Sequence, residues 1–113
     1  MTSPKAKPKR RGGLADQDQG IQVFRLYVSA ASPISARAIV NARRFMELRL
    51  PGAHRLEVLE IAENLPSAIT DEIIASPTLV RVVPAPARRF IGDLSDLSTL
   101  EASLGLAPSA DRA

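Results

Sequence analysis

The residues that could carry out chemistry are few, and their spacing does not build an active site. The chain has no cysteine, which excludes disulfides, thiolate metal sites and dithiol redox chemistry. His54 is the single histidine and has only Glu57 nearby, so we interpret it as a surface loop residue and not as a metal ligand. Asp71 and Glu72 are adjacent and would point apart on a helix. We therefore expect no enzyme activity, no metal and no cofactor.

Arg88 and Arg89 are the best candidates for a binding role. Adjacent strand residues point to opposite faces, so only one of the two arginines can face the core side. A guanidinium suits protein interfaces because its planar donors bind carboxylates in pairs. The residues leave a second interpretation open, in which charge at a sheet edge prevents stray strand pairing.

The stretch before these arginines predicts a buried strand headed by a proline. Pro77 lacks an N–H and can open a strand but not occupy its middle, and it is a candidate for a cis peptide bond. Thr78 to Val83 is an apolar run broken only by Arg81. That pattern is typical of a strand buried on both faces, with the arginine near an end or an edge.

The residues that follow predict a hairpin. Pro84 and Pro86 end the strand, and Arg88 to Ile91 is long enough for a short return strand. Gly92 and Asp93 then form a turn signal.

Upstream, the pattern predicts a strand, a helix and a second strand. Ile21 to Ser29 is rich in β-branched and aromatic residues. Ser32 and Pro33 supply an N-cap and a first helical residue, and Pro51-Gly52 ends that helix. Arg55 to Ile61 is the second strand, which a βαβ unit would place parallel to the first.

Two further helices complete the pattern. An apolar stripe at helical spacing comprises Leu65, Ile69 and Ile73. A last helix would begin with Ser95 or Ser98 as its cap, with Glu101 closing a capping box after Ser98. Its apolar stripe comprises Leu97, Leu100 and Leu104, and Gly105 ends it.

The order βαβαββα, with a proline heading the third strand, is the thioredoxin arrangement. We therefore predict an α/β fold with a mixed sheet in a single domain. Enzymes of this fold place a reactive cysteine pair after the first strand, at a helix N-terminus. Here that loop reads Ala30-Ala31-Ser32-Pro33 and offers no thiol. Tyr27 is near in sequence, but transferases of this fold add a helical domain for which the chain has no room.

The charge is unevenly distributed along the chain. The net charge is +3, and all of it falls on residues 1–20, which we expect to be a disordered basic arm. Residues 21–106 form the predicted domain and 107–113 a disordered tail. The arm is either a solvated tail or a tether for nucleic acid or an acidic partner. No apolar run could span a membrane and no secretory signal is present, so we expect a cytoplasmic protein with no membrane contact.

The residues from 21 to 106 resemble the KaiB family of circadian clock proteins. The resemblance is carried by Ser76-Pro77-Thr78-Leu79, Pro84-Ala85-Pro86 and Arg88-Arg89-Phe90-Ile91-Gly92-Asp93-Leu94-Ser95, with Leu26-Tyr27-Val28, Ser35-Ala36-Arg37-Ala38 and Leu56-Glu57-Val58-Leu59-Glu60-Ile61 upstream. It implies a regulatory protein without catalytic activity that binds the hexameric RecA-like ATPase KaiC and gates recruitment of KaiA or of a sensor histidine kinase.

The resemblance also implies roles for individual residues. It implies partner binding by a set of basic side chains, which comprises Arg37, Arg81, Arg88 and Arg89. It implies a homo-oligomer at rest, a tetramer of different topology that switches to a thioredoxin-like monomer, with Pro77, Pro84 and Pro86 as the candidate switch positions.

Departures from the family pattern cluster in the half that would refold. They comprise Glu72, Ala85, Ser103 and Gly105. The sequence therefore leaves open which topology the chain adopts at rest. The alternative function, a nucleic-acid or acidic-partner module acting through the basic arm, has little support from the body, which is neutral and poor in aromatic residues for base stacking.

Overall fold

The computed structural model describes residues 20–107. The expectations for the basic arm and for nearly all of the C-terminal tail therefore lie outside the described residues. Four strands form one sheet, in the order β3-β2-β4-β5. Their bounds are Gln22–Val28 for β2, His54–Glu60 for β3, Thr78–Val83 for β4 and Arg88–Ile91 for β5.

The sheet is mixed, as the sequence predicted. β2 pairs in parallel with β3 and antiparallel with β4, and β4 pairs antiparallel with β5. The parallel pair is joined by the long helix α2 (Pro33–Arg49), which completes the predicted βαβ unit. The order βαβαββα is confirmed, with a short 3-10 helix, η1 (Ile61–Glu63), added before α3 (Leu65–Thr70).

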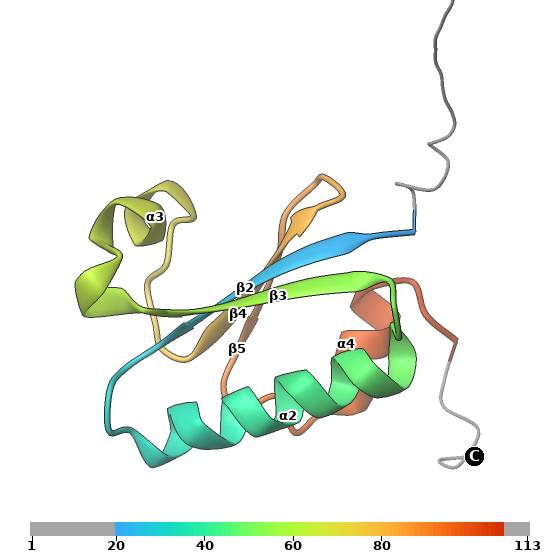
Figure 1. Ribbon diagram of the computed structural model, residues 1–113, viewed down its shortest axis with the longest axis horizontal. Helices are drawn as coiled ribbons and strands as arrows, with labels where there is room; N and C mark the ends of the chain where they lie inside the picture. The colour runs from blue at the N-terminus through green and yellow to red at the C-terminus, as the bar shows by residue number, and fades with distance from the viewer. Residues whose placement is uncertain (1–19, 108–113) are drawn as a thin grey trace, which may run out of the picture.

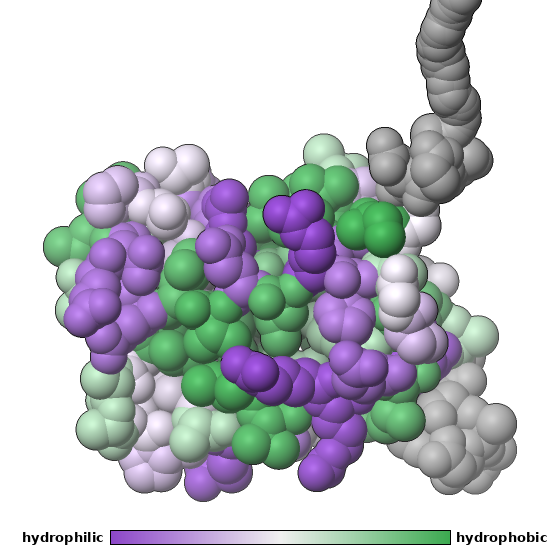
Figure 2. Space-filling view, viewed as in Figure 1, coloured by the Kyte–Doolittle hydropathy of each residue, from purple (hydrophilic) through white to green (hydrophobic). Residues whose placement is uncertain are grey.

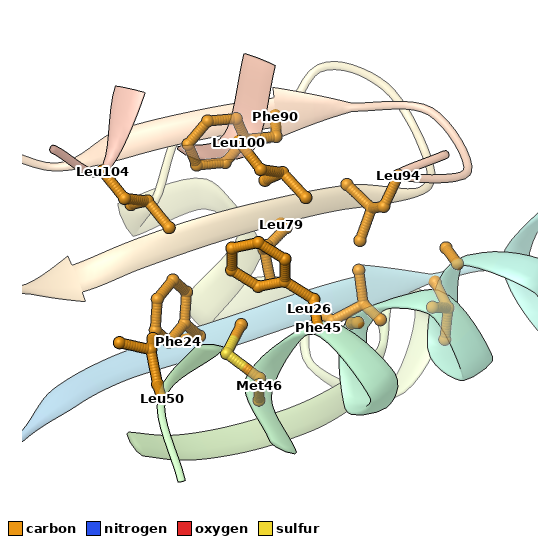
Figure 3. Packing of buried hydrophobic residues seen from close by; sticks show 13 residues of the cluster. Phe24, Leu26, Phe45, Met46, Leu50, Leu79, Phe90, Leu94, Leu100 and Leu104 are labelled. Atoms are coloured by element: carbon orange, nitrogen blue, oxygen red, sulfur yellow. The ribbon is translucent and has the colours of Figure 1, made fainter. Parts of the chain in front are cut away.

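The main core lies between the sheet and two helices. In Figure 1, α2 and α4 (Leu97–Ser103) lie together below the sheet, whereas α3 lies above it at the left. Figure 3 shows the side chains that fill this side of the sheet: Phe24 and Leu26 from β2, Phe45 and Met46 from α2, Leu79 and Phe90 from β4 and β5, and Leu100 and Leu104 from α4 and the residue after it. Phe24, Leu26, Met46 and Leu79 have no exposed surface, so these contacts carry much of the apolar burial.

The other face of the sheet has a much smaller core. Tyr27, Val80 and Ala68 form a second buried cluster, with Ile73 among its partly buried neighbours. The predicted stripe on α3 is therefore wrong in part: Leu65 and Ile69 are exposed. The helix has only six residues, so it ends before Ile73, and it buries only Ala68.

The prediction for the cap of α4 is also wrong. Asp96 is the N-cap, and its side chain accepts a hydrogen bond from the Thr99 N–H at 3.2 Å. Ser98 is not the cap, because it lies inside the helix, and Glu101 is buried and forms an ion pair with Arg49 of α2. The helix ends at Gly105 as expected, with φ at +75°.

Candidate functional site

The loop after β2, where a redox enzyme of this fold would carry its thiols, is held together by serine hydroxyls. Ser32 caps α2, accepting from the Ser35 N–H at 3.2 Å, and the Ser35 hydroxyl accepts from the Ser29 N–H at 3.1 Å. The Ser29 hydroxyl in turn lies 2.7 Å from that of Ser76. Ser32 thus has the structural role that its sequence position predicted, and the loop is built around helix capping.

The Gly92-Asp93 turn is tied to α2. Arg37 Nε lies 3.6 Å from Asp93 Oδ2, and the Asn41 amide donates to the Asp93 carbonyl at 2.8 Å. The Ser95 N–H donates to Asp93 Oδ1, and hydrogen bonding from Ser95, supported by Arg37, holds the pKa of the Asp93 carboxyl below its usual value. Gly92 has φ at +111°, a conformation that side-chain-bearing residues rarely adopt. Arg37 therefore helps to fasten the turn to the helix.

Arg89 is tied to the end of α3. Its Nε donates to the carbonyl of Asp71, the C-terminal cap of α3, at 2.9 Å, and its Nη2 lies 3.4 Å from Glu72 Oε1. Glu72 has φ at +58°, so the chain turns sharply there. Arg89 fixes this turn against β5 while about a third of its side chain stays exposed.

Beneath this turn lies a polar cluster of Tyr27, Arg25 and Asp71 that sequence reasoning missed. The Tyr27 hydroxyl donates to Asp71 Oδ2 at 2.5 Å, and Arg25 Nη1 donates to the same oxygen at 3.0 Å. Burial, and then the bond to Asp71, raises the pKa of Tyr27 to about 12, and Asp71 also raises the pKa of Arg25. The available signal was that residues 25 and 27 share one strand face, but their partner is 44 residues away in the sequence.

Arg81 and Arg88 are brought together across β4 and β5, where they are directly opposite. The prediction placed Arg81 near a strand end or a sheet edge. The edge is wrong, because β4 is an interior strand, but Arg81 does pair with Arg88 at the end of the β4–β5 ladder, where it is 7% exposed. Its two terminal nitrogens donate to the Gln22 side-chain oxygen and the Pro86 carbonyl, both at 3.5 Å. Burial, and then the charge of Arg88, lowers the pKa of Arg81.

The four basic candidates therefore do not form one site. Arg81 and Arg88 share the helix-covered face, Arg89 lies on the opposite face, and Arg37 is near the other end of β5. The three candidate prolines surround β4, and the peptide bonds Ser76–Pro77, Val83–Pro84 and Ala85–Pro86 are all cis.

A group of exposed apolar side chains surrounds α3. We call it the α3 surface, and it consists of Leu65, Ile69 and Ile74, which are 53%, 75% and 90% exposed. Figure 2 shows that hydrophobic surface on the viewed face of the molecule is interrupted by hydrophilic side chains. Leu65 and Ile69 are four residues apart in the sequence of α3 and therefore lie on the same side of the helix.

Over residues 20–107, no three or more His, Cys, Asp or Glu side chains gather as metal ligands would. Nor does any helix in that range have the length and apolar character to cross a membrane.

Comparison with known proteins identifies the fold and the family. Solved structures that resemble this one include the N-terminal domain of Synechococcus elongatus SasA (TM-score 0.63, 17% identity, 96% of each chain) and Fasciola hepatica thioredoxin (TM-score 0.62, 13% identity, 81% of this chain and 86% of that one). At these identities the likeness shows the fold alone, which is thioredoxin-like.

Sequence comparison is more specific. The circadian clock oscillator protein KaiB of Synechococcus elongatus is 40% identical over 74 residues, covering 66% of this chain and 72% of that protein. The KaiB of Microcystis aeruginosa is 40% identical over the same length, covering 71% of its own sequence. The family described as KaiB domain matches residues 25–106, from within β2 to the residues after α4. The chain therefore belongs to the KaiB family.

Proposed function

We propose that this chain is a non-enzymatic regulatory protein of a clock or clock-like system that binds a KaiC-type RecA-like ATPase. The observation that carries the proposal is the family match over residues 25–106, which includes the whole Arg88–Ser95 segment. Relatives that are 40% identical over 74 residues are named as clock oscillator proteins. A sensor histidine kinase is a second partner in this proposal, and the resting homo-oligomer of different topology belongs to it as well.

The α3 surface is the part of the domain that we propose docks on the ATPase. Ile69 and Ile74 would be desolvated on binding, and burying large apolar side chains is a main source of affinity at protein interfaces. Arg89, whose side chain is 37% exposed, adds a guanidinium near the end of α3. Because Arg89 also binds the cap of α3, it would contact the partner and hold the apolar residues in place.

The experiment is size-exclusion chromatography with light scattering of the chain alone and mixed with a KaiC-type ATPase, in ATP and in ADP. A nucleotide-dependent shift into a larger complex supports the proposal. Ile69→Asp should abolish the shift, because it places a charge at the centre of the α3 surface.

Leu48→Asp is the matched control. Leu48 is 68% exposed, close to the 75% of Ile69, but it lies on α2, on the opposite side of the sheet. The two substitutions carry similar risks for folding. A difference in binding would therefore show that the position of the charge matters, and not its presence alone. A chain that ignores the ATPase would overturn the function, and equal binding by both variants would overturn only the choice of surface.

A further inference from the structure

Arg81 is a buried charge without an ion-pair partner among residues 20–107. Its residue is 93% buried by accessible surface, and its Nε has no hydrogen-bond partner among residues 20–107. Its two terminal nitrogens reach only neutral acceptors, Gln22 and Pro86, at the long distance of 3.5 Å. Removing a charge from water costs several kcal/mol unless an opposite charge replaces the lost hydration.

A second arginine makes this imbalance larger. Arg81 and Arg88 are directly opposite across the antiparallel pair, so their side chains leave the sheet on the same face, where like charges are unfavourable. Leu79 and Phe90, two residues along each strand, point into the main core and identify this face as the one that α2 and α4 cover. Within residues 20–107 neither guanidinium forms an ion pair, although Arg25, Arg37, Arg49 and Arg89 all do.

The pair has the geometry of a receptor for a small anion. Arg81 lies in β4 at the end of its ladder with β5, and Arg88, directly opposite it, is exposed to solvent. Two guanidinium groups offer several N–H donors to one group of oxygen atoms, the arrangement that binds carboxylate and phosphate most strongly. An anion bound here would supply the negative charge that is missing beside Arg81, and it would reduce the repulsion between Arg81 and Arg88.

We propose that Arg81 and Arg88 form a binding site for an oxyanion, a phosphate group or a carboxylate, at the end of the sheet where β4 leads into β5. The site is independent of the proposed partner function, because it concerns the chain alone and a surface other than the α3 surface. A free phosphate-type ligand and an acidic side chain of another protein share this chemistry and are distinguished by the choice of probe.

The test observes the arginine side chains of the full chain directly. Proton–nitrogen spectra of the guanidinium Nε–H groups are recorded during titration with sodium phosphate, and separately with sodium acetate, against sodium chloride at matched ionic strength. Saturable shifts at Arg81 and Arg88 are expected with at least one oxyanion, while Arg43 and Arg44, both exposed on α2, should follow ionic strength alone. Saturation by phosphate alone assigns a phosphate-type ligand, whereas saturation by acetate assigns a carboxylate such as a protein side chain offers.

Variants complete the test. Arg88→Gln removes one charge-assisted set of donors from an exposed position and should weaken binding about tenfold or more. Arg44→Gln removes an equal charge from α2 and should leave the affinity unchanged. Shifts that never saturate, that match those of Arg43 and Arg44, or that are the same in Arg88→Gln as in the parent chain would overturn the site. The first two outcomes are read from the parent chain, so they remain decisive even if a variant folds poorly.

Discussion

Raising the pH above about 10 should destabilise this protein through ionisation of Tyr27. Its side chain has no exposed surface, and its hydroxyl donates to Asp71 Oδ2 at 2.5 Å. Burial, then the hydrogen bond to Asp71 and the charge of that carboxylate, raises the pKa of Tyr27 to about 12. An unfolded tyrosine has a pKa of about 10, so the folded state holds this proton more tightly.

The sign and size follow from linkage. Below about pH 10 the phenol is protonated in both states, and its contribution to stability is fully present. As the pH rises from there to about 12, the unfolded chain releases the proton first, so stability falls. A difference of about two pKa units corresponds to ~3 kcal/mol, a large fraction of the stability of a small domain.

The composition makes the assay direct. The chain has one tyrosine and no tryptophan, so the near-ultraviolet absorbance of tyrosinate reports Tyr27 alone. We expect ionisation of the folded protein well above pH 10, and urea-unfolded protein should titrate at the ordinary value. Circular dichroism on the same samples records whether the fold persists, and chemical denaturation at each pH gives the free energy of unfolding.

Tyr27→Phe is the control variant. It should lose roughly 1.5–3 kcal/mol near neutral pH, the net value of a hydrogen bond to a charged group, and the alkaline decline assigned to Tyr27 should disappear. Tyrosinate that forms near pH 10 while the circular dichroism stays native would refute the reasoning, because the phenol would then be neither desolvated nor bonded to Asp71.

Three further predictions concern other contacts. Arg49→Met should lower the free energy of unfolding by ~3 kcal/mol, because Glu101, with a side chain only 4% exposed, loses its ion-pair partner. Denaturant unfolding measures this, and a near-zero change would show that the ion pair is not needed for stability. Asp93→Asn should remove part of the loss of stability at low pH. The lowered pKa of Asp93 gives stability that is present above its ordinary pKa and is lost as the pH falls through the lower folded value. Thermal melts across the acid range test this, and an equal fall in melting temperature for both proteins would contradict it. Ser32→Ala should cost about 1 kcal/mol through loss of the α2 cap, against a neutral Ala30→Ser control in the same denaturant series.

Local patterns predicted the elements well, because each depends on residues close together in the chain. The Ser32-Pro33 helix start, the strand Thr78–Val83 and the return strand Arg88–Ile91 all have the predicted bounds. Their signals are a cap, a proline at each strand boundary and a run of β-branched residues, which act within a few residues. The family resemblance arose from the same segments.

The contacts of the charged residues could not be predicted in this way. Asp71 bonds to Tyr27 and Arg25, which lie 44 and 46 residues away, and Arg49 pairs with Glu101 over 52 residues. Glu101 fitted a local capping pattern, but the ion pair with α2 took its place. Arg81 was expected near a strand end or a sheet edge. It does lie at the end of the β4–β5 ladder, but local residues do not reveal the pairing order that makes β4 an interior strand.

The two faces of the sheet are held by different means, and this bears on the proposed function. The face under α2 and α4 is held by a broad apolar core, whereas α3 buries only Ala68 and is fixed mainly by polar contacts from Tyr27, Arg25 and Arg89. Because those contacts contribute roughly 1–3 kcal/mol each, against about 3–5 for each buried aromatic side chain of the main core, α3 should open locally at a lower free energy than α2. A surface that is both apolar and weakly held can adjust to a partner and bury its exposed isoleucines at little cost to the rest of the domain. Asp71→Asn should therefore speed amide hydrogen exchange in α3 selectively and leave α2 unchanged; an equal effect on both helices would mean that the faces unfold as one unit.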